Sequence, residues 1–169
     1  EVIDKFQIKY DPSCKCIIFP VYDEHNKLVM LTKRSVESKQ FYIDKNIQKP
    51  VYLLNNALNN NYKTLFVCES QINALTLYTY NLPAIALFGT GSSHQYDVLN
   101  KSGIKQFILC FDGDEAGEKG IKKFQNNIKG SFINILHLPP GKDVNDLTKE
   151  EFFKLLNDQG LKYLVFFLF

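Results

Sequence analysis

Short apolar runs alternate with amphipathic segments over the second part of the chain. Four runs have the length and composition of buried strands, at residues 64–68, 84–88, 106–111 and 132–138. Helix-like segments follow them at 70–80, at 115–127, at 149–157 and in a short stretch that ends near Gly103. Strands that alternate with helices pair in parallel and are covered on both faces. The pattern therefore predicts an α/β fold with a parallel four-stranded sheet flanked by helices.

The helix predicted at 70–80 has a clear beginning and end. Ser70 is a suitable N-cap residue, and the helix should end before Pro83 because the residue before a proline disfavours helical backbone. Ile72, Leu75 and Thr79 are spaced to share one helical face.

Before residue 64 the pattern is that of antiparallel strands. The β-rich runs 16–22 and 28–33 are joined by a polar segment with the composition of a hairpin turn. Shorter strands are predicted at 41–43 and 51–54, and five asparagines within 55–61 predict a loop or short helix. We expect a small β-rich N-terminal subdomain over 1–60, the α/β domain over 61–150, and a C-terminal helix and apolar tail over 151–169.

Composition and charge indicate where in the cell the chain is expected. The chain has 169 residues and a net charge of +2, which divides unevenly: residues 1–63 hold ten Lys or Arg against seven acids. The apolar tail is too short to span a bilayer, so we expect no membrane partner. The chain opens with Glu-Val-Ile-Asp, without methionine or signal peptide, and its four cysteines form no Cys-x-x-Cys pair. These features predict a cytoplasmic piece of a longer protein.

Oxygen-bearing side chains follow the first, third and fourth predicted strands. These candidates are Glu69, Asp112, Asp114, Asp143, Asn145 and Asp146. The carboxyl ends of parallel strands open on one edge of the sheet, so we expect the side chains to converge there. Oxygen ligands without His or Cys suit Mg²⁺ or Mn²⁺ better than zinc. One such acid would usually be a helix-terminal charge, but three clusters at one edge favour a metal site.

Other interpretations of the Asp-Gly-Asp-Glu-Ala-Gly segment can be compared with its residues. An EF-hand needs an oxygen ligand at position five and Glu at position twelve, where this chain has Ala116 and Lys123. We expect Gly113 to leave room for a ligand and Gly117 to permit close packing of the helix on the sheet. The turn at 89–91 is typical of a phosphate-binding loop, but no P-loop or dinucleotide motif completes it.

Together these motifs resemble a known family. Glu69 after an apolar strand, Gly-Thr after the next, Phe-Asp-Gly-Asp-Glu-Ala-Gly after the third and Gly-Lys-Asp-Val-Asn-Asp after the fourth resemble the TOPRIM domain, over residues 64–147. That domain is shared by bacterial-type primases, topoisomerases and some nucleases. The Ile-Phe-Pro-Val strand, its hairpin and Val-Tyr-Leu at 51–53 resemble the subdomain before TOPRIM in DnaG-type DNA primases. A primase catalytic core is therefore favoured.

The resemblance implies synthesis of short RNA primers on single-stranded DNA from nucleoside triphosphates. It implies Glu69, Asp112 and Asp114 as catalytic residues, joined as ligands of Mg²⁺ or Mn²⁺ by Asp143, Asn145 and Asp146. Basic residues of the preceding subdomain are implied to contact nucleotide or template, here Lys33, Arg34 and Lys39, although a charged strand edge would look the same. A replicative helicase is an expected partner through regions outside this chain. The family usually has Gly and Asp where this chain has Ser70 and Asn73.

Two other functions stay open. A TOPRIM nuclease or topoisomerase would use the same acids to cut phosphodiesters, but a topoisomerase needs a nucleophilic tyrosine in a separate gate region, for which this chain offers no candidate segment. A non-catalytic TOPRIM nucleic-acid-binding module would be expected to lose its acids, yet Glu69, Asp112 and Asp114 are all present. Nucleotidyl transfer is therefore the first hypothesis.

Overall fold

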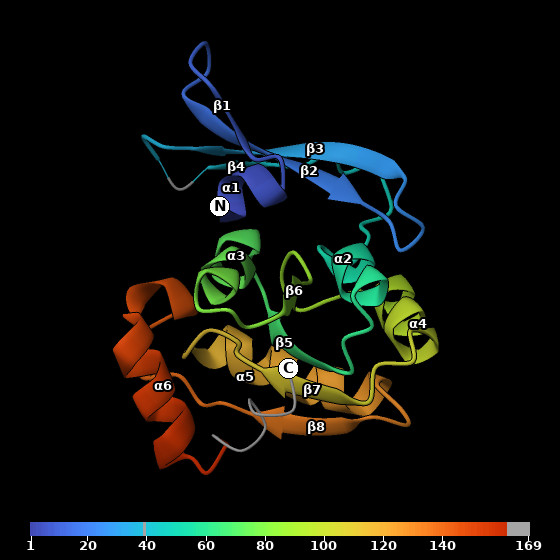
Figure 1. The fold of residues 1–169 in the computed structure, drawn as a ribbon, viewed down its shortest axis with the longest axis vertical. Coiled ribbons are helices and arrows are strands. Elements are labelled where there is room, and N and C mark those ends of the chain that lie inside the picture. Colours follow the sequence, from blue (N-terminus) through green and yellow to red (C-terminus); the bar gives the residue numbers. More distant parts are fainter. Residues whose placement is uncertain (39, 162–169) are drawn as a thin grey trace.

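The chain forms two four-stranded sheets, one above the other, with helices between and below them (Figure 1). The computed structural model describes residues 1–38 and 40–161. One sheet is antiparallel, in the order β1-β2-β3-β4, and the other is parallel, in the order β6-β5-β7-β8. The expected fold class, a parallel four-stranded sheet flanked by helices and preceded by a small β-rich part, is confirmed.

The antiparallel sheet consists of β1 (Lys9–Asp11), β2 (Cys16–Tyr22), β3 (Leu28–Ser35) and β4 (Phe41–Tyr42), and the short helix α1 (Val2–Lys5) precedes it. The parallel sheet consists of β5 (Thr64–Cys68), β6 (Ala84–Ala86), β7 (Gln106–Leu109) and β8 (Phe132–Ile135). The helices are α2 (Leu54–Asn59), α3 (Gln71–Thr79), α4 (Ser93–Lys101), α5 (Glu115–Asn127), the 3-10 turn η1 (Val144–Asp146) and α6 (Lys149–Asp158).

The parallel strands lie where the apolar runs predicted them. The strand at 64–68 and the helix at 115–127 are confirmed residue for residue. The other three parallel strands begin at the predicted residue and end two or three residues early. After β7 and β8 the chain then enters the loops that carry Asp112, Asp114, Asp143 and Asp146.

The central strand β5 faces two separate cores. Phe66 and Cys68 pack into the core that holds α3 and α6, whereas Leu65 and Val67 pack into the core that holds α4 and α5. All four side chains are fully buried. A strand covered on both faces has a continuous apolar sequence, and each large apolar side chain buried there stabilises the fold by about 1.5–3 kcal/mol.

Helix α3 lies between the two sheets (Figure 1). Of the three side chains predicted to share one helical face, Leu75 is buried, Ile72 is half-buried and Thr79 is exposed. The helix packs on β5 and β6 and also bonds to the antiparallel sheet, where Thr32 Oγ1 donates to Gln71 Oε1 at 2.7 Å.

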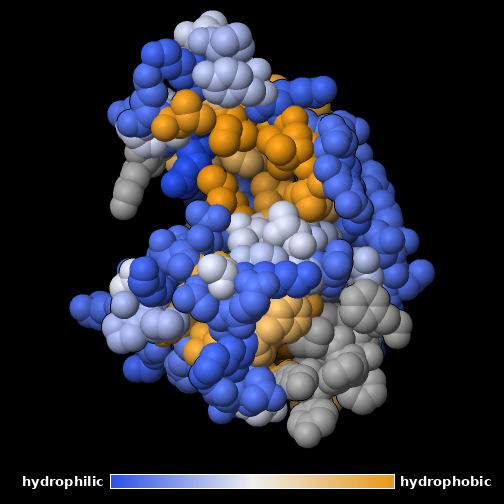
Figure 2. Space-filling model, turned by 60° about the vertical axis from the view of Figure 1, so that its left-hand side comes forward, coloured by the Kyte–Doolittle hydropathy of each residue, from blue (hydrophilic) through white to orange (hydrophobic). Residues whose placement is uncertain are grey.

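A groove of about 370 Å³ separates α3 from the antiparallel sheet on one side of the molecule. Figure 2 shows apolar side chains gathered in this hollow. Its lining includes Ile3, Ile8, Ile17, Phe19, Ile72 and Leu75. The antiparallel sheet therefore rests on α3 through apolar contacts without covering the helix completely on this side.

The strand predicted at 51–54 is wrong. Only Tyr52 pairs with the sheet, in an isolated antiparallel bridge to Ala86. Leu53 takes a left-handed backbone conformation with φ of 64°, and Leu54 begins α2. This turn directs the chain away from the sheet, so the asparagine-rich segment that follows is largely a short helix, one of the two structures expected for it.

The predictions for two cysteines are confirmed: Cys68 and Cys110, predicted as buried thiols, are both fully buried. Over the described ranges no helix has the length and apolarity needed to cross a bilayer. The apolar tail, beyond Leu161, lies outside the described residues.

Helix α5 begins in direct contact with the loop it follows. A Cβ atom on Gly117 would lie 2.0 Å from the carbonyl oxygen of Asp112, so this glycine permits close packing, as expected, although its neighbour is loop backbone. A Cβ atom on Gly113 would lie 2.2 Å from the carbonyl oxygen of Pro139. The expectation that Gly113 leaves space for a ligand is therefore wrong, because the backbone at Pro139 fills that space.

We predict that Gly117→Ala lowers the free energy of unfolding by about 2–3 kcal/mol, because the new methyl group meets Asp112 backbone that cannot move freely. At an uncrowded helix position the same change would stabilise by up to about 1 kcal/mol. Gly120→Ala is the comparison, since its Cβ would meet side-chain atoms of Phe111 and Thr90 at 2.8 Å rather than backbone, and it should cost less than Gly117→Ala. Urea unfolding measures both, and an unchanged or raised value for Gly117→Ala contradicts the packing described.

Candidate metal and nucleotide site

Three parallel strands deliver acids to the same edge of the sheet. Glu69 follows the last residue of β5, Asp112 lies three residues beyond the end of β7, and Asp143 lies in the loop after β8. Neighbouring parallel strands have their carboxyl ends at one edge. The topology therefore brings residues that are more than 70 positions apart to one place.

Glu69 is turned toward the Asp112 loop. Its Oε1 atom accepts a hydrogen bond from the backbone N–H of Asp112 at 3.2 Å. Its own carbonyl oxygen accepts from the N–H of Gly89 at 3.0 Å, which ties it to the loop after β6. The structure thus brings Glu69 and Asp112 together as predicted from their positions after two strands.

Asp112 lies among other carboxylates. The pKa of Asp112 is raised to about 7, first by burial and then by the negative charges of Glu69, Asp143, Asp114 and Asp146. Burial also raises the pKa of Glu69. A carboxylate in this setting is costly to ionise, and a bound divalent cation would reverse that cost.

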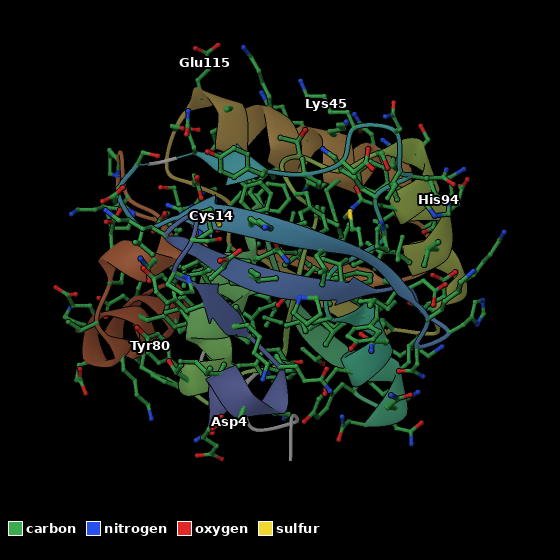
Figure 3. The ribbon with its side chains drawn as sticks, turned by 90° about the horizontal axis from the view of Figure 1, so that it is seen from above. Asp4, Cys14, Lys45, Tyr80, His94 and Glu115 are labelled. Carbon is green, nitrogen blue, oxygen red and sulfur yellow. The ribbon has the colours of Figure 1, made fainter. Side chains whose placement is uncertain are left out.

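The outer acids also have local structural roles. Asp114 Oδ1 accepts from the N–H of Gly117 at 2.8 Å and so caps α5. Asp143 and Asp146 cap the two ends of one turn, with each side chain accepting from the other's backbone N–H at 3.1 and 3.0 Å. The next acid along, Glu115, projects from the periphery of the molecule (Figure 3). These bonds use one oxygen of each aspartate.

Asn145 is not brought to the Glu69–Asp112 pair by its side chain. Its Oδ1 atom accepts from Thr76 Oγ1 of α3 at 3.1 Å, and its backbone N–H donates to Asn73 Oδ1 at 3.3 Å. Asn73 in turn approaches Asp112, with Nδ2 3.5 Å from Oδ1. In the sequence, Asn73 is seen only as a departure from the family pattern. Its position one helical turn after Glu69 is the signal that could have identified it as a residue of this site.

The donor chemistry fits a hydrated hard cation. Over residues 1–38 and 40–161, no group of three or more His, Cys, Asp or Glu side chains is close enough to hold a metal ion by itself. Mg²⁺ usually keeps several waters and binds through one or two carboxylates together with substrate phosphates. Glu69 and Asp112, half-buried and surrounded by further carboxylates, match that mode better than an enclosed cage.

Basic and aromatic side chains line a pocket of about 280 Å³ together with Glu69. The lining includes Arg34, Phe41, Lys49, Glu69, Gln71 and Phe88. The rings of Phe41 and Phe88 lie with centroids 6.5 Å apart. The pocket therefore joins one of the acids to two cations and an aromatic wall.

The predicted basic residues do not all reach this pocket. Side chains alternate across a strand, so Arg34 faces the pocket while Lys33 lies on the other face of β3, where its Nζ is 3.4 Å from Asp11 Oδ2. Figure 3 looks down on the antiparallel sheet from that side. Lys39 lies outside the described residues. Lys49 was missed, because a single lysine in an irregular segment carries no signal.

The chain is similar in sequence to two groups of known proteins. A family described as Toprim-like matches residues 66–148. The DNA primase of Clostridium acetobutylicum is 26% identical, over 93% of this chain and 29% of its own length. That of Campylobacter jejuni is 30% identical, over 90% of this chain and 28% of its own length. The chain thus spans less than a third of the length of the curated relatives it matches.

The fold is also similar to solved structures. The structure of the DnaG catalytic core has a TM-score of 0.76 at 18% identity, covering 93% of this chain and 68% of that one. A DnaG primase catalytic domain bound to single-stranded DNA has a TM-score of 0.70 at 21% identity, covering 93% and 57%. The primase fragment of the bacteriophage T7 primase-helicase protein gives 0.68 at 19%, covering 94% and 69%. At these identities the likeness establishes the fold.

We predict that Asp112→Asn raises the free energy of unfolding in EDTA at pH 8, because it removes a carboxylate that is costly to ionise. The gain should be about 1–2 kcal/mol, less than the full pKa shift would give, because the site is half-exposed. The folded chain binds more protons than the unfolded chain between pH 4 and 7, so wild-type stability falls as pH rises through that window. The gain should therefore shrink toward pH 4.

Denaturant titrations from pH 4 to 8 measure this effect. Asp97→Asn, an exposed aspartate on α4, is the matched control and should change stability by less than about 0.5 kcal/mol. A loss of stability in Asp112→Asn at pH 8 would show that the carboxylates do not repel one another as described.

Proposed function

We propose that this chain, whose residues 66–148 are a Toprim-like domain similar to that of the DnaG primase core, carries the catalytic core of a DNA primase. The proposed reaction is nucleotidyl transfer on a single-stranded DNA template, in which a 3′-hydroxyl attacks the α-phosphate of a nucleoside triphosphate and pyrophosphate leaves. One observation carries this proposal: the Glu69 carboxylate bonds to the Asp112 loop and also lines a pocket with Arg34 and Lys49.

The proposal assigns a task to each part of the chain. Residues 61–150 serve as the TOPRIM domain with the acids, residues 1–60 supply cations, and residues 151–169 contribute the C-terminal helix and tail. The related proteins are more than three times longer than the matched segment. Further regions would therefore contribute to the activity of the whole protein.

Glu69 and Asp112 are the residues proposed to hold Mg²⁺ or Mn²⁺, while Asp114, Asp143 and Asp146 add negative charge around them. When bound, the cation would neutralise triphosphate oxygens and stabilise charge on the leaving pyrophosphate. Glu69 has a raised pKa because it is partly buried. This brings it closer to the range in which a carboxylate can accept the proton of the attacking hydroxyl.

The pocket residues are proposed to bind the nucleotide. Arg34 can make two parallel hydrogen bonds to phosphate oxygens, and Lys49 adds a mobile point charge. Phe41 and Phe88 form an apolar wall on which a base can stack. With these residues in one pocket, the triphosphate would be oriented toward Glu69.

Two alternatives use the same acids. A TOPRIM nuclease or topoisomerase would cleave phosphodiesters, and a non-catalytic TOPRIM module would bind nucleic acid without metal. The pocket of two cations and two aromatic rings supports nucleotide binding more directly than either. Similar structures described as bound to single-stranded DNA and as part of a primase-helicase protein support DNA template and helicase as partners.

We predict that the chain, at low salt with Mn²⁺ or Mg²⁺, extends an oligoribonucleotide annealed to single-stranded DNA, and that Asp112→Ala reduces this at least 100-fold. Low salt matters because a net charge of +2 predicts weak, salt-sensitive DNA binding. Gel analysis of labelled products separates the hypotheses. Strand cleavage without synthesis supports a nuclease, and metal-independent binding unaffected by the substitution supports a binding module.

We predict that Arg34→Ala raises the KM for nucleoside triphosphate about tenfold or more, the loss expected for a charged hydrogen bond to phosphate. Lys33→Ala is the matched control on the opposite face of β3 and should change KM less than twofold. Steady-state incorporation of labelled nucleotide measures both. Equal effects of the two substitutions would mean that the strand acts as a general basic surface and that the pocket is not the nucleotide site.

A further inference from the structure

Asn73 is a fully buried amide at the acidic edge of the sheet. Its side chain is 1% exposed, whereas Asp112 beside it is half-buried and Asn145 is exposed. It occupies the first turn of α3, where its backbone N–H is capped by Ser70 Oγ at 3.2 Å. A polar side chain buried this deeply is stable only if its hydrogen-bonding groups are satisfied.

Both ends of the Asn73 amide face loops that carry acids. Oδ1 accepts from the backbone N–H of Asn145 at 3.3 Å, and Nδ2 points to Asp112 Oδ1 at 3.5 Å. The first loop follows β8 and the second follows β7, while Glu69 lies four residues before Asn73 in the chain. One side chain therefore connects the turn that contains Asp143 and Asp146 to Asp112.

The chemistry of the two contacts selects an amide. Asparagine has an acceptor oxygen and a donor nitrogen on the same carbon, so it can accept from the Asn145 N–H and donate to the Asp112 carboxylate at once. Aspartate keeps the acceptor but places a second negative charge against Asp112. Leucine, of similar size, makes neither hydrogen bond and leaves the Asn145 N–H without this acceptor.

We propose that Asn73 is a positioning residue that holds the Asp112 carboxylate and the 143–146 turn in a fixed relation, so that Asp112 presents its oxygens to the cation while the acids of the turn add negative charge beside it. This inference rests on the proposed function, in which Glu69 and Asp112 hold Mg²⁺ or Mn²⁺. Residues that orient metal ligands without touching the metal typically change affinity by about 10- to 100-fold when removed. We assign Asn73 that role.

The test is direct binding of Mn²⁺ to the full chain, which is measured by calorimetry and by the electron paramagnetic resonance signal of free Mn²⁺. Asn73→Leu should weaken Mn²⁺ binding by about 10-fold or more. Asn73→Asp should bind Mn²⁺ at least as tightly as the wild type, because the acceptor is kept and a charge is added, but should melt at a lower temperature in EDTA. Asn73→Asp should thus lose stability and keep its Mn²⁺ affinity, whereas Asn73→Leu should lose Mn²⁺ affinity. General damage to the fold would instead lower both quantities in both variants.

Gln95→Leu is the matched control. Gln95 is also 1% exposed, and its Nε2 donates to two backbone carbonyls, those of Pro50 and Leu87. This change should lower the melting temperature and leave the Mn²⁺ affinity within twofold of the wild type. Comparison with Asn73→Leu thus separates the general cost of losing a buried amide from the specific loss of Mn²⁺ binding expected at Asn73.

Two results would overturn the inference in different ways. If the wild type binds Mn²⁺ and Asn73→Leu binds it within twofold, Asn73 does not position the ligands, while the proposed function stands. If the wild type binds no Mn²⁺, the proposed function fails, and this inference fails with it.

Discussion

Repulsion between carboxylates at one edge of the parallel sheet is the constraint on which the rest of the structure depends. The pKa of Asp112 is raised to about 7 by burial and by four neighbouring acids. Left to relax, these side chains would separate into solvent. They are kept in place by backbone, because Glu69 is bonded to the Asp112 N–H and the loops contact each other where Gly113 meets the Pro139 carbonyl. The two cores around β5 supply the stability that tolerates this arrangement.

The antiparallel sheet gives the other half of the electrostatic arrangement. The basic surplus of residues 1–63 is seen in the sequence only as a difference in counts, but in the fold part of it becomes one wall of a pocket. Arg34 from β3 and Lys49 from the following segment line that pocket together with Glu69. Contact with α3 on one side holds the sheet above the acids, so the packing of apolar residues there also sets how far the cations lie from the anions.

Much of this could be predicted because it follows from local patterns. A strand buried on both faces has an unbroken apolar run, which located β5, and strand-end acids must converge in a parallel sheet. Features that depend on tertiary contacts could not be predicted. The burial of α3 required knowing that a second sheet covers it, the turn at Leu53 hides in a β-like sequence, and the space beside Gly113 is filled by a loop that lies 26 residues later at Pro139. Arg34 and Lys33 are adjacent in sequence, yet strand alternation sends only one of them to the pocket.

Separation of the charges is what makes the site useful. If the Arg34 guanidinium lay against Glu69 or Asp112, each charge would be neutralised within the protein, and an exposed ion pair of that kind would contribute little stability. Within the part of the chain that the structure describes, the ion pairs of basic residues from the antiparallel sheet lie elsewhere, as in Lys33 with Asp11. The pocket thus has two cations, Arg34 and Lys49, and one carboxylate, Glu69, which connects it to the acidic edge of the parallel sheet. A triphosphate that carries a divalent cation is complementary to both kinds of charge at once, and charges fixed before binding need little reorganisation when charge shifts during transfer.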